Sequence, residues 1–279
     1  MKKTYKLNNE VEIPSVGFGT WKIEDSPLAK EVVVTAIQNG YTHIDTAQIY
    51  KNEKSVGEGI KSSGKNREDL FITTKLWNDV TTYDEAIASF NGSMERLDLE
   101  YLDLLLIHWP NPLKLRDNKW QERNKEVYRA MEDLYEAGKI KSIGISNFKI
   151  HHIEELLKTA RIVPQVNQIK ICPGVEDTKL IEYCQEKKII LEAYSPLGRG
   201  DMLTNEVIVK IAEKYGKTPA QVTIRWSLDK GYLPLPKSQT KERIISNYMV
   251  YDFALTKEEV EEISSIQYDK VMDSDTVEF

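Results

Sequence analysis

The sequence predicts an α/β protein, a (β/α)8 TIM barrel with an N-terminal β-hairpin and additional C-terminal helices. Short apolar runs rich in Val, Ile and Leu alternate with longer segments of helical period, and eight such runs occur. The runs read SVGFGT, YTHIDT, LFITTKLW, YLDLLLIHW, IKSIGISN, VPQVNQIK, IILEAYSP and YLPLPKS. A doubly wound open sheet is the alternative, but eight units and the lack of a Gly-rich first turn favour the barrel.

The chain opens with a predicted hairpin, TYKL-NN-EVEI, in which two short alternating runs flank Asn8 and Asn9. Asparagine tolerates the positive φ of a tight turn, so we expect the Asn pair to form that turn.

The helices between the runs carry local start and stop signals. Residues 84–97 place apolar side chains on one face, and Thr82 with Glu85 forms a capping box ahead of them. Gly138 is expected to end the helix that precedes the fifth run. TKEE at 256–259 begins a further helix after the eighth run.

Composition narrows the classes of function. A net charge of −6 gives no general attraction for nucleic acid or anionic membrane. The two cysteines, Cys172 and Cys184, form no CxxC pair, which fits a reducing compartment. The N-terminus, MKKTYKLNNEVEIP, lacks the apolar stretch of a signal peptide. We therefore expect a soluble cytoplasmic protein with a single domain over residues 1–279.

Polar side chains stand at the ends of successive predicted strands. They are Asp45, Lys75, His108, Ser146, Asn147, Gln168, Tyr194, Lys237 and Ser238. Each has a purely structural explanation on its own, such as a helix cap for Asp45 or a satisfied core position for His108. Because the C-terminal ends of barrel strands collect on one face, the whole set predicts a shared site there.

Four of these side chains suggest proton-transfer chemistry. Asp45 and Lys75 can form a buried ion pair, and Tyr50 can lie beside Lys75. A free tyrosine has a pKa of about 10, and a nearby cation is expected to lower it towards neutral pH. His108 can donate a second hydrogen bond to an oxygen held against Tyr50. Two donors on one oxygen suit the alkoxide that forms when hydride attacks a carbonyl.

These motifs resemble the aldo-keto reductase family over nearly the whole chain: GFGTW, HIDTAQIYKNE, FITTKLW, LDLLLIHWP, IGISNF, VNQI, AYSPLG and PKS-x4-R. The resemblance implies NADPH-dependent reduction of small aldehydes and ketones without a metal. It implies that Asp45, Tyr50, Lys75 and His108 are catalytic, with Tyr50 as the general acid. The positions that it implies for binding NADPH/NADP+ are Thr20, Ser146, Asn147, Gln168, Tyr194, Ser195, Leu197, Lys237, Ser238, Arg243 and Asn247.

Within that set, the resemblance assigns Ser146, Asn147 and Gln168 to the carboxamide of the nicotinamide and Tyr194 to stacking on its ring. Three positions depart from the family pattern. Lys170 and Cys172 replace an acid and a histidine, and Ser246 replaces the commonly acidic residue before Asn247.

The segment PKSQTKER at 236–243 predicts which nicotinamide cofactor is used. It combines Lys237, Lys241 and Arg243 with a helix start after the eighth strand, where barrels commonly bind phosphate. The 2′-phosphate separates NADPH from NADH, and Arg can grip a phosphate through two parallel hydrogen bonds. We therefore expect a preference for NADPH.

The sequence gives weaker signals for the substrate pocket and for the loops around the site. Trp21, Trp77 and Trp109 follow strand ends and are expected to form an aromatic substrate pocket, with core packing as the alternative. The chain stops soon after its last helix, at VMDSDTVEF, so any C-terminal lid is expected to be short. His151 and His152 suggest a metal, but no Cys or acid has suitable spacing, so no metal is expected.

Two other functions stay open. The same barrel serves as a cofactor-sensing regulatory subunit of potassium channels, although all four catalytic positions are filled here. Alternatively, Lys75 is the nucleophile of a Schiff-base lyase. The expected partner is a small carbonyl substrate, with no nucleic acid and no membrane, and we expect a monomer.

Overall fold

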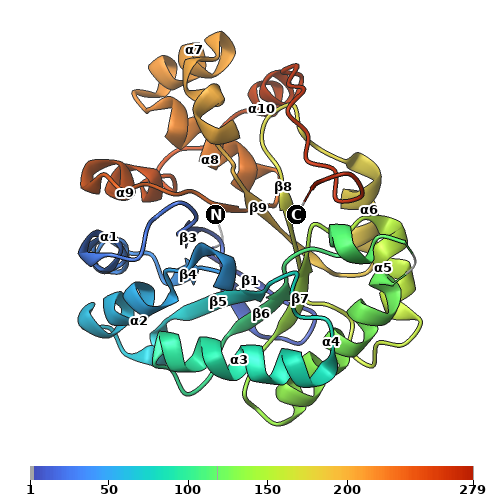
Figure 1. The fold of residues 1–279 in the computed structure, drawn as a ribbon. Helices are drawn as coiled ribbons and strands as arrows, with labels where there is room; N and C mark the ends of the chain where they lie inside the picture. Colours follow the sequence, from blue (N-terminus) through green and yellow to red (C-terminus); the bar gives the residue numbers. More distant parts are fainter. Residues whose placement is uncertain (1–2, 118, 279) are drawn as a thin grey trace.

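A computed structural model describes residues 3–117 and 119–278, and in it eight parallel strands form a nearly closed barrel (Figure 1). The barrel strands are β3 (Gly17–Gly19), β4 (His43–Asp45), β5 (Phe71–Leu76), β6 (Leu104–Ile107), β7 (Ile143–Ser146), β8 (Val166–Lys170), β9 (Ile190–Tyr194) and β10 (Leu233–Leu235). Each strand lies within one predicted run and pairs with its neighbours in chain order. The N–H of Gly19 donates to the carbonyl of Pro236 at 3.0 Å, which brings β3 and β10 together. The predicted barrel is confirmed.

Helices surround the barrel on the outside (Figure 1). They are α1 (Pro27–Gln38), α2 (Glu53–Ser62), α3 (Tyr83–Leu97), α4 (Trp120–Glu136), α5 (Ile150–Leu157), α6 (Thr178–Glu186), α7 (Glu206–Tyr215), α8 (Pro219–Asp229), α9 (Lys241–Tyr248) and α10 (Lys257–Ser264). Short 3-10 helices are η1 (Gln48–Tyr50), η2 (Arg67–Asp69), η3 (Leu113–Leu115) and η4 (Gly198–Thr204). Two helices follow β10, as predicted. Within the described residues, no helix has both the length and the apolar character needed to cross a bilayer.

The helix boundaries follow the local signals in the sequence. Thr82 and Glu85 bond reciprocally at the start of α3, and Thr256 and Glu259 do the same at α10. Gly138, just beyond the end of α4, has a φ of 69°. These caps satisfy backbone groups that a helix end would otherwise leave without partners. The predicted starts and stop are confirmed.

The N-terminal hairpin covers one end of the barrel. Strand β1 (Thr4–Lys6) pairs antiparallel with β2 (Glu12–Pro14). Leu7 and Ile13 pack against Phe71 and other residues near the beginnings of the barrel strands. The hairpin therefore lies at the end opposite to the strand ends that carry the predicted site.

The hairpin turn falls on the predicted Asn pair. Asn8 and Asn9 are the central residues of a turn that is closed by the N–H of Glu10, which donates to the carbonyl of Leu7 at 3.0 Å. The expected positive φ falls on the next residue, Glu10, at 68°. The Asn side chains also bond to distant segments: Asn8 Nδ2 donates to the carbonyl of Pro164 at 3.1 Å, and Asn9 Nδ2 to that of Lys141 at 2.9 Å.

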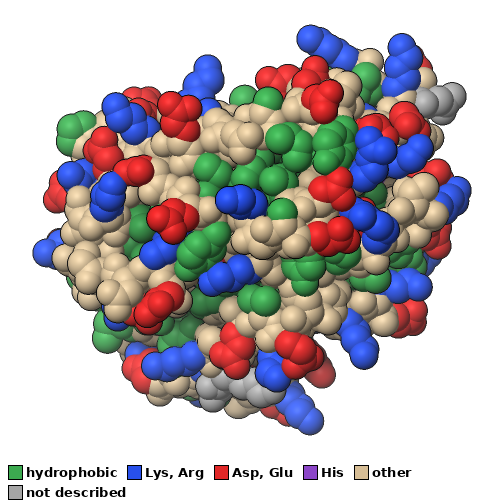
Figure 2. Space-filling model, turned by 90° about the horizontal axis from the view of Figure 1, so that it is seen from below, with side chains coloured by type: hydrophobic (Ala, Val, Ile, Leu, Met, Phe, Trp, Pro, Cys, Tyr) green, Lys and Arg blue, Asp and Glu red, His purple; other side chains and the backbone are tan. Residues whose placement is uncertain are grey.

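The surface carries mixed charge. On the face drawn in Figure 2, acidic and basic side chains are interspersed, and neither sign gathers into a continuous field. Many charged side chains of the protein form ion pairs; Arg161, for example, contacts both Glu132 and Asp133. Several residues with strongly shifted pKa values, Tyr50 and His108 among them, lie at the strand ends.

Candidate active site

A buried ion pair lies at the centre of the strand ends. Lys75, at 0% exposure, directs its ammonium to both oxygens of Asp45 at 2.7 and 2.8 Å. Its third hydrogen bond goes to the carbonyl of Thr46 at 2.8 Å. Strands β4 and β5 are neighbours, which brings the two side chains together as the sequence predicts. All the N–H groups of Lys75 are used in these contacts.

Tyr50 lies beside this pair, on η1. The Lys75 ammonium is 5.1 Å from the centre of the Tyr50 ring. The predicted direction of its pKa is wrong, because the pKa of Tyr50 is raised well above 10 by burial and by the charge of Asp45. Asp45 offsets the charge of Lys75, so the cation cannot outweigh the loss of solvent. The side chain is accordingly a protonated phenol, which suits a proton donor.

His108 follows β6 and faces Tyr50. The two ring centres are 5.8 Å apart, with an edge-on arrangement. Burial, assisted by the charges of Lys75 and Arg123, holds the pKa of His108 well below its ordinary value. The imidazole is therefore neutral and retains one N–H that it can donate. Trp77 packs edge-on against the same ring, with centres 5.0 Å apart.

The turn that carries Tyr50 is held by Asn52, which the sequence analysis missed. Asn52 is fully buried, and its amide donates to the carbonyls of Thr20 and Ile23 at 3.0 and 2.8 Å. Its oxygen accepts from the hydroxyl of Thr46 at 2.8 Å. The signal for this role is the Asx position just before α2, although Asn52 bonds across the molecule instead of capping that helix.

A second group of predicted residues forms a connected network on β7, β8 and β9. The Ser146 hydroxyl donates to the carbonyl of Gln168 at 2.7 Å, and Asn147 Nδ2 donates to the carbonyl of His108 at 3.0 Å. The Tyr194 hydroxyl donates to Asn147 Oδ1 at 2.8 Å. Asn147 and Ser195 both have positive φ, at 63° and 51°. Such backbone at strand ends is typical of functional sites.

A third group surrounds the start of α9. Burial and the nearby Lys22 lower the pKa of Lys237. Among the described residues, Lys237, Lys241 and Arg243 form no ion pair with an acidic side chain. The N-cap residue of α9, Thr240, makes no side-chain cap. Cations without acidic partners beside open helical N–H groups fit an anionic phosphate.

Comparison with known proteins identifies the family. A sequence model of the aldo/keto reductase family matches residues 15–267. The chain belongs to the aldo/keto reductase family. It is 48% identical over 270 residues to the glyoxal reductase of Bacillus subtilis (strain 168), covering 97% of this chain and 95% of that protein.

Two solved structures of aldo/keto reductases have a fold similar to that of this chain. The first, an enzyme from a Medee basin deep-sea metagenome library, is 41% identical, with a TM-score of 0.92 and coverage of 99% of this chain and 100% of that one. The second, from Bombyx mori, was solved in complex with NADP. It is 36% identical, with a TM-score of 0.85 and coverage of 94% and 91%.

The three tryptophans differ in their surroundings in this aldo/keto reductase. Trp109 is buried at 5% exposure, and its ring stacks near His108 with centres 6.5 Å apart. Trp21 is 38% exposed, and the guanidinium of Arg199 lies 5.2 Å from its ring centre. Arg123, missed by the sequence analysis, donates to the carbonyls of Trp77 and Trp109 at 3.1 and 2.9 Å. This buried arginine on α4 thus holds the backbone of Trp77 and Trp109 in place.

The three positions that depart from the family pattern lie on β8, just after it and on α9. Lys170 ends β8 and donates to the carbonyl of Lys270 in the C-terminal segment. Cys172 is fully buried, and burial raises the pKa of its thiol to about 11, which makes it an unreactive thiol. The hydroxyl of Ser246 donates to the carbonyl of Arg243, within α9.

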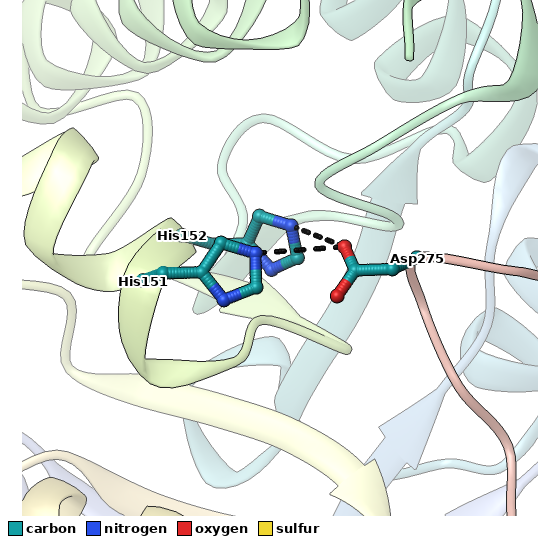
Figure 3. A group of neighbouring side chains, drawn as sticks. All are labelled: His151, His152 and Asp275. Carbon is teal, nitrogen blue, oxygen red and sulfur yellow. Dashed lines mark ion pairs between the residues drawn. The ribbon is translucent and has the colours of Figure 1, made fainter.

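The expectation that His151 and His152 have no acidic partner is wrong. Asp275, from the C-terminal segment, lies 3.5 Å from His151 Nε2 and 3.0 Å from His152 Nε2 (Figure 3). The three side chains have the types and proximity of metal ligands. However, His152 Nδ1 accepts the backbone N–H of Lys149 at 3.1 Å, and the Lys149 ammonium is 2.9 Å from Asp275. A metal-bound imidazole normally donates from its other nitrogen, so this cluster fits a tail contact better than a metal.

Proposed function

We propose that this protein reduces small aldehydes and ketones, dicarbonyls such as glyoxal among them, to alcohols with NADPH. The observation that carries the proposal is the convergence of a protonated Tyr50, a neutral His108 and the Asp45–Lys75 pair at one end of the barrel. The substrate class follows the relative named glyoxal reductase.

The chain's own residues handle the proton. NADPH, when bound, supplies the hydride. Tyr50 gives its proton to the carbonyl oxygen as that oxygen gains negative charge, and neutral His108 donates a hydrogen bond to the same oxygen. Lys75, fixed by Asp45, offsets the charge left on the phenolate. His108 acts here as an orienting donor because its imidazole is neutral.

The residues described above fit a nicotinamide cofactor. Ser146, Asn147 and Gln168 would bond its carboxamide, with Tyr194 against the ring. The remaining contacts would come from Thr20, Ser195, Leu197, Lys237, Ser238, Arg243 and Asn247. Support for the phosphate end comes from the absence of acidic partners for the cations near α9 among the described residues.

Trp21, Trp77 and Trp109 remain the proposed lining of the substrate site. Trp77 and Trp109 flank the ring of His108, where a carbonyl would meet Tyr50. Trp109 is buried at 5% exposure, so it would shape this wall from behind while Trp77 and Trp21 contact the substrate.

The test is loss of NADPH absorbance with glyoxal, compared with NADH and with a simple aldehyde. Turnover of NADPH supports the reductase, and NADPH binding without turnover of any carbonyl would favour the cofactor-sensing alternative. The lyase alternative is disfavoured because Lys75 spends its hydrogen bonds on Asp45 and Thr46. Borohydride trapping of a carbonyl substrate on Lys75 would nevertheless support the lyase.

The single domain of residues 1–279, which includes four residues outside the described part, stays a prediction, as do the monomeric state and the cytoplasmic location.

A further inference from the structure

A second carboxyl group lies inside the barrel, one layer below the ion pair. Glu192, on β9, is fully buried, at 0% exposure. Its side chain points to the same side of the strand as that of Tyr194, two residues on. Glu192 Oε2 accepts a hydrogen bond from Gln168 Nε2 at 2.8 Å. A buried acid inside a barrel calls for an explanation, because burial of a carboxylate is costly without a partner.

Gln168 joins this acid to the ion pair. Its Nε2 also donates to Asp45 Oδ1 at 2.8 Å, so both amide hydrogens bond to carboxyl oxygens. The amide oxygen is thereby turned away from the two acids. The reverse orientation would set the amide oxygen against two carboxyl groups. The hydrogen bonds of Glu192 and Asp45 therefore fix which way Gln168 points.

The cations around Glu192 are too few to neutralise both Glu192 and Asp45 if both were ionised. The titratable groups that face it are His43 and Asp45 from β4 and Lys75 from β5, while β8 and β10 contribute the uncharged Gln168 and Leu233 beside it. Lys75 is committed to Asp45. Burial lowers the pKa of His43 to about 3, so this imidazole, 3.6 Å from Glu192 Oε1, brings no charge.

We propose that Glu192 is a positioning residue of the active site. Its bond to Gln168 orients the Gln168 amide on the side where the cofactor would bind, and so keeps Asp45 against Lys75. The role in cofactor binding rests on the proposed function. Burial and the charge of Asp45 raise the pKa of Glu192 to about 8. The protonated form supplies an acceptor for Gln168 without a second negative charge. Its proton belongs on Oε1, which has no other hydrogen-bond partner among the described residues.

Ionisation of Glu192 has two measurable consequences. The folded protein holds a proton that the unfolded chain releases near pH 4.3, so this carboxyl progressively destabilises the fold as the pH rises from there to about 8. Ionisation also sets a second charge beside Asp45 and disturbs Gln168, which weakens NADPH binding. If only the protonated form binds, the affinity is about tenfold lower at pH 9 than at pH 7.

The experiment compares the wild-type protein with Glu192→Gln, Glu192→Leu and the control Glu132→Gln. Glu132 is also buried, at 2% exposure, but it bonds to Arg161 and Ile162 on the outside of the barrel. Thermal unfolding without cofactor and NADPH titration by fluorescence are each measured between about pH 6 and pH 9. Neither readout requires turnover.

Glu192→Gln is expected to melt above the wild-type protein at pH 9 and to bind NADPH equally at all pH values. Glu192→Leu removes the acceptor and is expected to bind NADPH weakly throughout, whereas Glu132→Gln keeps the wild-type pH dependence. An unchanged melting profile in Glu192→Gln would overturn the proposal, and so would an altered melting profile with an unchanged pH dependence of NADPH binding. A wild-type protein that binds NADPH but reduces no carbonyl would count against the proposed reductase alone.

Discussion

Two polar clusters in this molecule both combine Asp, Lys and His side chains, one inside the barrel and one near the surface. The interior layer consists of Asp45, Lys75, Gln168, Glu192 and His43, all of them buried on barrel strands. The tail anchor consists of Lys149, His151, His152, Asp273 and Asp275, where α5 meets the C-terminal segment. Figure 1 shows this segment, in dark red, running from α10 towards the α5–α6 side.

The two clusters differ in how far their charged side chains are exposed to water. Lys75 is 0% exposed and Asp45 only 5% in its side chain, whereas Lys149 is 33% exposed, Asp273 44% and Asp275 31%. When one partner of a buried pair is removed, no water can solvate the charge that remains. When one partner of an exposed pair is removed, water solvates the other. The interior layer is therefore suited to hold charges at fixed positions for chemistry, and the tail anchor to hold a segment in place with small energies.

The first prediction separates the effect on catalysis from the effect on stability in the interior layer. Tyr50→Phe keeps the ring but removes the proton donor, so reduction should fall by roughly 10²–10⁴-fold while NADPH binding stays near normal. Single-turnover hydride transfer and fluorescence titration measure the two quantities. Tyr83→Phe is the matched control, since it removes a hydroxyl that bonds to Asp133 on the outside of the molecule. Near-normal turnover in Tyr50→Phe would exclude Tyr50 as the acid.

The second prediction makes the same substitution in both clusters. Lys75→Met leaves Asp45 buried without its cation, and should lower the free energy of unfolding by about 3–5 kcal/mol and abolish reduction. Lys149→Met leaves two partly exposed carboxylates, and should lower the free energy of unfolding by less than about 1 kcal/mol for each of its two ion pairs. Urea unfolding of the two variants gives both values. Equal decreases would show that the two settings do not differ in the way their burial implies.

The interior layer is partly predictable from the sequence, and the tail anchor is not. Asp45 and Lys75 each mark a strand end, and the barrel's topology turns strand ends into neighbours. Glu192 lies two residues before Tyr194 in IILEAYSP, so strand alternation puts the two side chains on the same face, but the sequence analysis considered only the strand ends and missed this acid. Asp275 follows the last helix and meets His152 only through tertiary structure. Spacing in the sequence carries no information about such a contact.

The same limit explains the errors in detail. A cation near Tyr50 predicts a lowered pKa, yet burial decides the direction, and burial cannot be read from the motif. Asn8 and Asn9 form the predicted turn, but the positive φ falls on Glu10, and both Asn side chains bond to segments more than a hundred residues away. Capping boxes at Thr82 and Thr256 are predictable because every atom involved lies within four residues.

The third prediction concerns cations near α9 that, unlike Lys149, have no acidic partner in the described part of the chain. If Arg243 binds the 2′-phosphate, Arg243→Ala should raise the KM for NADPH by about 10–100-fold, the equivalent of one or two charge-assisted hydrogen bonds. The KM for NADH should change little. Higher salt should weaken NADPH binding more than NADH binding. Equal affinity of the wild-type protein for both cofactors at low salt would refute the phosphate clamp.

The smallest expected effect tests the tail anchor directly. Although burial opposes it, bonding to Lys149 and Asn111 holds the pKa of Asp275 below its ordinary value, and burial lowers the pKa of His152 to about 4. The folded state therefore binds fewer protons than the unfolded chain at both groups. The contribution of His152 is complete above about pH 6.5 and is lost as the pH falls towards 4, whereas that of Asp275 is lost only below about pH 4.

Acidification from pH 7 to about pH 4 should accordingly lower the hydrogen-exchange protection factors of the C-terminal segment, which correct for the slower intrinsic exchange in acid, before those of the barrel change. At neutral pH, Asp275→Asn should produce the same local loosening and lower the free energy of unfolding by only about 0.2–1 kcal/mol. Asp269→Asn is the control, because Asp269 is exposed in the same segment and has no ion pair among the described residues. Zinc added to the wild-type protein should not protect the segment, because Lys149 already bonds to Asp275 and His152 Nδ1 accepts a backbone N–H. Protection by zinc, or a decrease of several kcal/mol in Asp275→Asn, would mean that this cluster is a metal centre or a buried network, and its contrast with the interior layer would fail.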